Sequence, residues 1–160
     1  MTPSKRLLPG SGLLFTNRAI RILLLAGKLA RQTTSLVSPS HILQALAWGE
    51  RGNGRAILER SSIDLPAIVG MPPDFLGGML DKIPMIALEL DGLSNQLIEL
   101  GGRETLDVGL GKAIGTESLV FGILAMTDLP ECKILTQYGV SLVSAKEALD
   151  RARREVRKEG

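Results

Sequence analysis

The segment LDVGLGKAIG, residues 106–115, comes nearest to a known chemical motif. A P-loop has the pattern Gly-x4-Gly-Lys-Ser/Thr, because its backbone N–H groups hold phosphates and its hydroxyl binds Mg²⁺. Here Leu106 stands at the first glycine position and Ala113 at the hydroxyl position, and no strand pattern precedes the segment. We therefore expect a flexible loop that binds no nucleotide.

The other reactive side chains occur singly. His41 is the only histidine and Cys132 the only cysteine, whereas a metal site usually recruits several His, Cys or carboxylate ligands. We expect a structural role for His41 beside a helix N-terminus, and we expect Cys132 to be a small turn residue. No acid, base and nucleophile converge in the sequence. The sequence thus predicts a protein that is not an enzyme and has no cofactor and no metal.

Composition narrows the classes of partner. The chain of 160 residues carries a formal net charge of +2, with 44% hydrophobic and 22% charged residues, as soluble globular proteins do. So small a net charge gives no overall field that would concentrate nucleic acid or an anionic membrane. The longest apolar run, 22–27, is far shorter than the ~20 residues of a membrane span. We expect a cytoplasmic protein with no nucleic-acid or membrane partner.

One short helix start is written twice, as VSPSHILQAL (37–46) and as IGTESLVFGI (114–123). Placing His41 on Ser118 sets a separation of 77 residues (118 minus 41), and the match of apolar positions continues without a gap to Leu65 on Leu142. Self-similarity over about thirty residues indicates a duplicated structural unit.

The apolar spacing predicts helices in both copies. The first begins at Thr16 as N-cap, and the second begins after Ser38 with Pro39 at its first position. Trp48 is expected to be a packed or half-packed aromatic. Helices are predicted over 15–32, 38–48, 54–61, 85–100, 116–126, 130–139 and 141–159, with a further turn within 62–70, a linker over 70–78 and a loop over 101–115. The fold class is all-α: two pseudo-symmetric four-helix repeats packed into one compact bundle of about eight helices.

These motifs in this order resemble the double Clp N-terminal domain, from Phe15 to about Leu149. Its repeats typically begin a second helix with Gly-Thr-Glu-His followed by Ile or Leu and then Leu. The resemblance implies an N-terminal extension over 1–14, a domain over 15–150 with repeats 15–72 and 79–150, and the end of the last helix over 151–160. It also implies a non-enzymatic module that binds substrates or adaptors for a Clp-type AAA+ unfoldase. Its partners would be Clp ATPase or protease subunits, adaptor proteins or unfolded substrate segments.

The duplicated helix starts supply the candidate site. Helix N-termini present unpaired N–H groups, which suit an acidic group on a partner. The two starts would therefore frame a groove for a protein segment. The candidate partner-binding residues are Thr16, Ser40, His41, Thr116, Glu117 and Ser118.

The chain departs from the family's pattern in both copies. The first copy has Ser38, Pro39 and Ser40 in place of Gly-Thr-Glu, and the second has Ser118 in place of the histidine. Some relatives use that glutamate, with a threonine near the first helix, to hold phosphorylated arginine. Here Glu117 stands only in the second copy. Thr16 stands only in the first, because Pro84 lies near the equivalent place.

Two further questions stay open on the sequence. The chain fits either a stand-alone accessory protein or the front of a longer ATPase. The alternative function is a helical regulatory module unrelated to proteolysis, for example a transcriptional one. Its discriminating feature would be a basic recognition helix, and none stands out.

Overall fold

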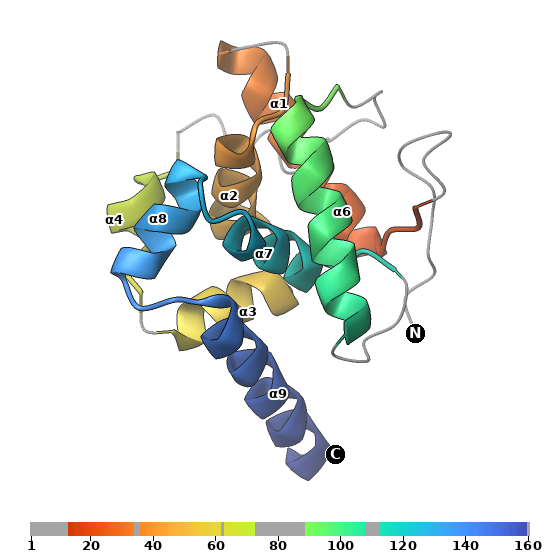
Figure 1. The fold of residues 1–160 in the computed structure, drawn as a ribbon, viewed down its shortest axis with the longest axis vertical. Coiled ribbons are helices and arrows are strands. Elements are labelled where there is room, and N and C mark those ends of the chain that lie inside the picture. Colours follow the sequence, from red (N-terminus) through yellow and green to blue (C-terminus); the bar gives the residue numbers. More distant parts are fainter. Residues whose placement is uncertain (1–12, 34–35, 62, 73–88, 108–112, 160) are drawn as a thin grey trace.

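A computed structural model of the chain describes residues 13–33, 36–61, 63–72, 89–107 and 113–159 (Figure 1). Within these ranges the protein is all-helical, and its only strand-like pairings are two isolated backbone bridges. This confirms the all-α prediction. The eight described helices are α1 (Asn17–Thr33), α2 (Pro39–Trp48), α3 (Asn53–Arg60), α4 (Leu65–Val69), α6 (Gly92–Asp107), α7 (Thr116–Ala125), α8 (Pro130–Gln137) and α9 (Leu142–Glu159).

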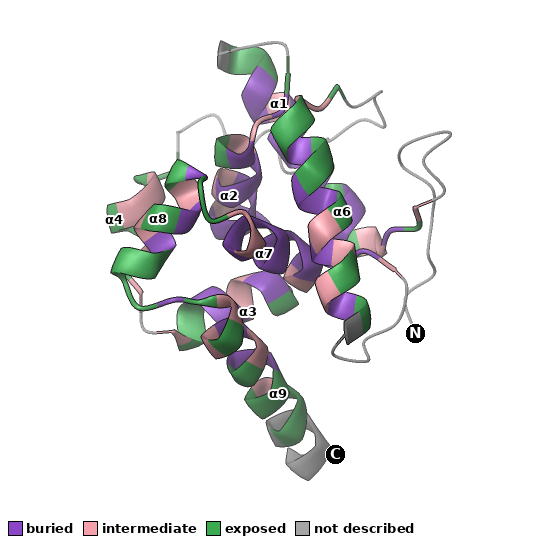
Figure 2. Ribbon diagram, in the orientation of Figure 1, coloured by how far each residue is buried: buried purple, intermediate pink, exposed green. Residues whose placement is uncertain are grey.

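Helix α7 is the centre of the core. All its residues from Ser118 to Leu124 are buried, and Figure 2 shows a mostly buried helix with the other elements around it. Helices α1, α2, α3, α6, α8 and α9 all contact it. A helix that is apolar on every side is stable only when it is surrounded, so α7 organises the fold.

Helices α6 and α7 cross at unusually close range because glycine removes the side chain from each contact point. A Cβ added to Gly101 would lie 1.9 Å from the backbone oxygen of Ser118, and one added to Gly122 would lie 2.1 Å from that of Leu97. Real Cβ atoms do not approach so closely, so both positions require glycine in this packing.

The position of α6 corrects two sequence predictions. The helix predicted over 85–100 begins only at Gly92, and Leu90 instead forms a backbone bridge with Val37; residues 85–88 lie outside the described ranges. The loop predicted over 101–115 is helical as far as Asp107. Gly101 permits the close packing of α6 on α7, and Gly102 lies against the Ile114 side chain.

The two repeats exchange backbone hydrogen bonds in a symmetric pattern. Thr16 N–H donates to the Ile114 carbonyl at 2.9 Å, and Ile114 N–H donates to the Leu14 carbonyl at 2.8 Å. In the same way Asp91 N–H donates to the Val37 carbonyl at 2.9 Å, and Val37 N–H donates to Glu89 at 2.8 Å. The segment before each repeat's first helix thus pairs with the segment before the other repeat's second helix.

The two repeats differ most in the length of their last helix. Helix α4 has 5 residues and ends at Gly70 with φ of 80°, whereas its counterpart α9 has 18 residues. The first part of α9 packs on α3 and α7, and its C-terminal part extends away from the body in Figure 1.

Candidate functional site

The second of the two duplicated helix starts, at residues 114–118, lies beside Thr16; we call this place the α1–α7 junction. Thr16 caps α1, since its Oγ1 accepts the Ala19 N–H at 3.2 Å. Its backbone pairing with Ile114 brings this cap beside the start of α7. Thr16 and Glu117 are both partly exposed, so two predicted site residues from different repeats reach the surface at neighbouring helix N-termini.

Ser118 is used inside the fold. Its Oγ accepts the Gly115 N–H at 3.0 Å and lies 2.6 Å from Thr105 Oγ1. Thr105 donates its own proton to the Gly101 carbonyl at 2.8 Å, so Ser118 is the donor in the pair of hydroxyls. This chain links α7 to α6 and is fully buried. A partner cannot reach the Ser118 side chain in this structure.

The Thr116 side chain also forms a hydrogen bond in the interior of the protein. Its Oγ1 accepts the Gly54 N–H at 2.9 Å, and the side chain is buried. The bond joins the start of α3 in the first repeat to the start of α7 in the second. Thr116 and Ser118 therefore shape the α1–α7 junction from within, and Glu117 between them is partly exposed.

The pseudo-symmetric place, the α2–α6 junction, comprises residues 37–41 and Asp91. Asp91 caps α6, because its Oδ1 accepts the Ser94 N–H at 2.7 Å. Asp91 is therefore the structural counterpart of Thr16, at a separation of 75 (91 minus 16). The expectation that Pro84 takes this place is wrong, and Pro84 itself lies outside the described residues. Ser40 is exposed at the start of α2.

His41 holds the first turn of α2. Its Nδ1 lies 3.1 Å from Ser38 N and 2.9 Å from Ser38 Oγ, so Nδ1 accepts hydrogen bonds and the ring proton is assigned to Nε2. Burial lowers the pKa of His41 below its ordinary value, while the nearby Asp91 carboxylate raises it. His41 thus has a structural role as predicted, and it remains half-buried at the surface.

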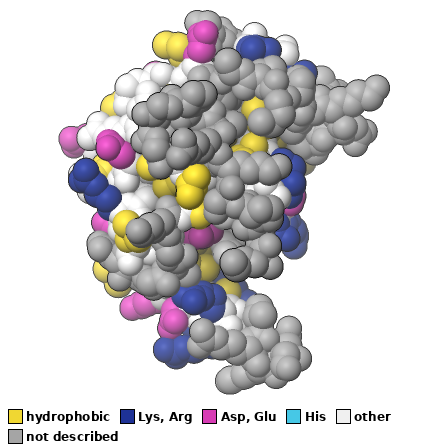
Figure 3. Space-filling model, turned by 90° about the vertical axis from the view of Figure 1, so that its right-hand side faces the viewer, with side chains coloured by type: hydrophobic (Ala, Val, Ile, Leu, Met, Phe, Trp, Pro, Cys, Tyr) yellow, Lys and Arg dark blue, Asp and Glu magenta, His cyan; other side chains and the backbone are white. Residues whose placement is uncertain are grey.

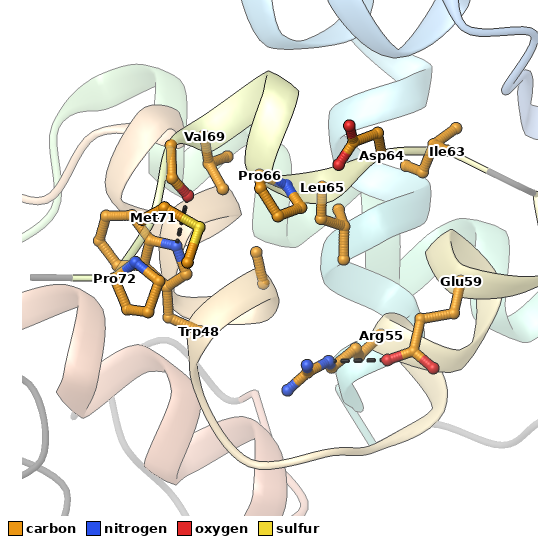
Figure 4. A pocket seen from close by; sticks show the side chains of 12 residues that line it. Trp48, Arg55, Glu59, Ile63, Asp64, Leu65, Pro66, Val69, Met71 and Pro72 are labelled. Atoms are coloured by element: carbon orange, nitrogen blue, oxygen red, sulfur yellow. Dashed lines mark hydrogen bonds and ion pairs between the residues drawn. The ribbon is translucent and has the colours of Figure 1, made fainter.

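A hollow of about 350 Å³ lies between α2, α3 and α4. Figure 4 shows Trp48 beside Met71 and Pro72, with the Arg55–Glu59 ion pair at the other side of the hollow. Trp48 is half-buried and its Nε1 donates to the Gly70 carbonyl at 3.2 Å. It is the half-packed aromatic that the sequence predicted.

The described residues do not meet the requirements of a metal site or of a membrane-spanning helix. They bring no three His, Cys, Asp or Glu side chains together in a way that could hold a metal ion. Cys132 is buried in the first turn of α8, with Sγ 3.6 Å from the Leu124 carbonyl. No described helix has the length and hydropathy needed to cross a membrane. Figure 3 shows basic and acidic side chains lying next to one another on the face in view.

The fold and the two junctions define an internally duplicated, all-helical domain. It is similar to the crystal structure of the Hsp104 N-terminal domain from Candida albicans, with a TM-score of 0.58 and 18% sequence identity. The match covers 87% of this chain and 91% of that chain. No protein-family model and no curated protein matches the sequence. The chain therefore shares the fold of this N-terminal domain.

Proposed function

We propose that this protein is a non-enzymatic recognition module that binds substrates or adaptors for a Clp-type AAA+ unfoldase or protease. The observation that carries the proposal is the fold likeness to the Hsp104 N-terminal domain, which covers most of both chains. The recognition domain would comprise residues 15–150, with repeats 15–72 and 79–150, between an extension over 1–14 and a helix end over 151–160.

The binding surface in this proposal is formed by the two junctions. Thr16, Ser40 and His41 present polar groups at helix N-termini, where backbone N–H groups and the helix dipole favour an acidic partner group. The Glu117 carboxylate at the start of α7 suits a basic partner group instead. Thr116 and Ser118 act from beneath by fixing the backbone that carries Glu117. The partners would be Clp ATPase or protease subunits, adaptors or unfolded substrate segments, in the cytoplasm and without nucleic acid or membrane.

Capture of partners is the test of this function. The purified chain, immobilised, is exposed to the host's Clp ATPase and protease subunits and to host lysate, and retained proteins are quantified against blank resin. Retention of a Clp subunit, an adaptor or an unfolded protein is the expected result. Retention of none of these would contradict the proposal, and retention of a transcription regulator alone would favour the alternative function.

We also expect the protein neither to bind nor to hydrolyse ATP. The P-loop pattern fails at Leu106 and Ala113. At the end of the segment, Ile114 N–H already donates to Leu14 and Gly115 N–H to Ser118, so neither can hold a phosphate. The middle of the segment, 108–112, lies outside the described residues. Calorimetric titration should show no ATP binding, and saturable binding in the micromolar range would contradict this prediction.

A further inference from the structure

Four arginines gather where α1 meets the connection between α2 and α3. Two glutamates lie among them and balance only half of their positive charge, which leaves a formal charge of +2 (four minus two). We call this group the arginine patch; it consists of Arg18, Arg21, Glu50, Arg51, Arg55 and Glu59.

Each glutamate in the patch is shared by two arginines. Glu50 accepts from Arg21 through both oxygens, with Nη2 at 2.8 Å, and lies 3.4 Å from Arg18 Nε. The hydrogen bonds from Arg21 hold the pKa of Glu50 below its ordinary value, so this carboxylate stays ionised. Glu50 therefore holds the Arg21 guanidinium by two hydrogen bonds, whereas it makes one longer contact with Arg18.

The second glutamate repeats this arrangement. Glu59 accepts from Arg55 Nε at 2.8 Å and lies 3.6 Å from Arg51 Nη2. Arg55 also donates to the Gly49 carbonyl at 3.2 Å, which ties α3 to the end of α2. Arg55 thus has a structural place, whereas Arg51 makes one long contact.

Arg18 and Arg51 keep most of their hydrogen-bonding capacity. Their side chains are 57% and 75% exposed, and a guanidinium carries five N–H donors in a planar fork that matches a carboxylate. They flank Gly52, the N-cap residue of α3. A Cβ added there would lie 3.5 Å from Arg18 Cδ and 3.0 Å from Thr116 Oγ1. The patch therefore borders the α1–α7 junction.

The second repeat shows that the fold does not require these charges. At separations of 75 and 77 residues, Leu93 and Gln96 replace the two arginines of α1, and Thr127 and Asp128 replace Glu50 and Arg51. There the same helix ends enclose a hollow of about 410 Å³ that Leu93, Gln96, Asp128 and Leu129 help to line. Since one copy is built without an arginine at this place, folding alone does not account for the arginine patch.

We propose that the arginine patch binds an acidic segment of a protein partner, with Arg18 and Arg51 as the side chains that receive its carboxylates. The inference rests on the proposed recognition function and adds the chemistry of the partner segment. A protein segment fits better than nucleic acid, because a continuous phosphate backbone would meet Glu50 and Glu59, whereas separate carboxylates can avoid them. A segment with a basic group facing Glu117 and acidic groups over the patch would match both surfaces.

The test uses the full chain and a fluorescent peptide of about ten residues in which Glu alternates with Ser, followed by anisotropy at low ionic strength. The variant Arg18→Gln/Arg51→Gln is compared with Arg31→Gln/Arg103→Gln, which removes the same charge from exposed positions outside the patch. We expect the patch variant to weaken binding about tenfold and the control to weaken it less than about twofold. A peptide with Gln in place of Glu should not bind, and circular dichroism verifies the fold of both variants.

Several outcomes would overturn the inference. These are equal losses in the two variants, no binding of the acidic peptide, or tighter binding of a single-stranded oligonucleotide than of the peptide. Failure of this inference can be distinguished from failure of the proposed recognition function. If only the inference fails, a captured partner should lose affinity for Glu117→Lys and keep its affinity for Arg18→Gln/Arg51→Gln.

Discussion

His41 and Ser118 occupy equivalent places and meet the same backbone requirement with different side chains. Each lies at the third position of its helix and accepts the N–H of the N-cap residue, Ser38 or Gly115. This is the reciprocal half of a capping box, which a Glu or Gln side chain usually supplies. The imidazole accepts only while Nδ1 is unprotonated, so the first repeat has a titrating cap and the second does not.

His41 should therefore make stability depend on pH. Burial places the folded-state pKa below the ordinary value of 6.5, so the unfolded chain binds the proton first as pH falls. The free energy of unfolding should decrease as pH falls below about 6.5, until the pH is below the folded-state pKa. His41→Gln keeps an acceptor that does not titrate in this range. Urea unfolding between pH 7.5 and about 5 should show a flatter profile for the variant; parallel profiles would contradict this role.

At the scale of helices, the crossing of α6 and α7 should be the most sensitive to added volume. Gly101→Ala places a methyl group 1.9 Å from the Ser118 oxygen, and overpacking of this kind costs about 1–3 kcal/mol or more despite the better helix propensity of alanine. Gly92→Ala on the same helix meets nothing within 4 Å, so it serves as the control and should leave stability nearly unchanged. Urea midpoints of the two variants decide this, and equal midpoints would show that the crossing is not close-packed.

The sequence predicted the helix starts that depend on local chemistry. Pro39 after Ser38, and Thr116 with Glu117 after Gly115, are recognisable as helix N-termini, and α2 and α7 begin there. It ended α6 too early, because glycine has a low helix propensity and is enriched just after helix ends, so the pair Gly101 and Gly102 favours a loop. Glycine is needed at position 101 because this residue packs against the backbone of α7. A local sequence pattern does not contain that contact.

The candidate site was predicted in part for the same physical reason. Thr116 and Ser118 were expected at the surface, but Gly54 and Thr105, distant in the sequence, pair with them in the interior. Asp91 was missed because the sequence comparison placed Pro84 opposite Thr16, a separation of 68 (84 minus 16), whereas the two caps are 75 residues apart (91 minus 16). An Asp three residues before Ser94 is a recognisable helix-start signal, and it would have located this cap.

At the scale of the whole molecule, the two repeats complete each other. The Thr16–Ile114 and Val37–Asp91 hydrogen bonds and the Gly54–Thr116 bond all join one half to the other. Fragments of about 70–85 residues have only marginal cores, and here the apolar faces of each repeat pack on the other repeat. Residues 1–74 and 75–160, expressed separately, should therefore be poorly structured by circular dichroism, and mixing them should recover helical signal. Two halves that each melt cooperatively would refute the shared core.

The measurement that most directly tests the account is the affinity of a captured partner for Glu117→Lys, with Glu147→Lys on the exposed face of α9 as the matched charge reversal. Ser40→Arg tests the symmetric α2–α6 junction in the same way. We expect Glu117→Lys to weaken binding by up to about fivefold, because it reverses the charge that would face a basic partner group and a single partly exposed charge contributes ~1 kcal/mol or less. We expect Ser40→Arg to weaken binding to a similar extent, because the longer side chain would cover the exposed start of α2. Glu147→Lys should leave affinity unchanged, and all three melting temperatures should stay close to that of the wild type. Undiminished binding by both junction variants would show that the paired helix N-termini are not the recognition surface.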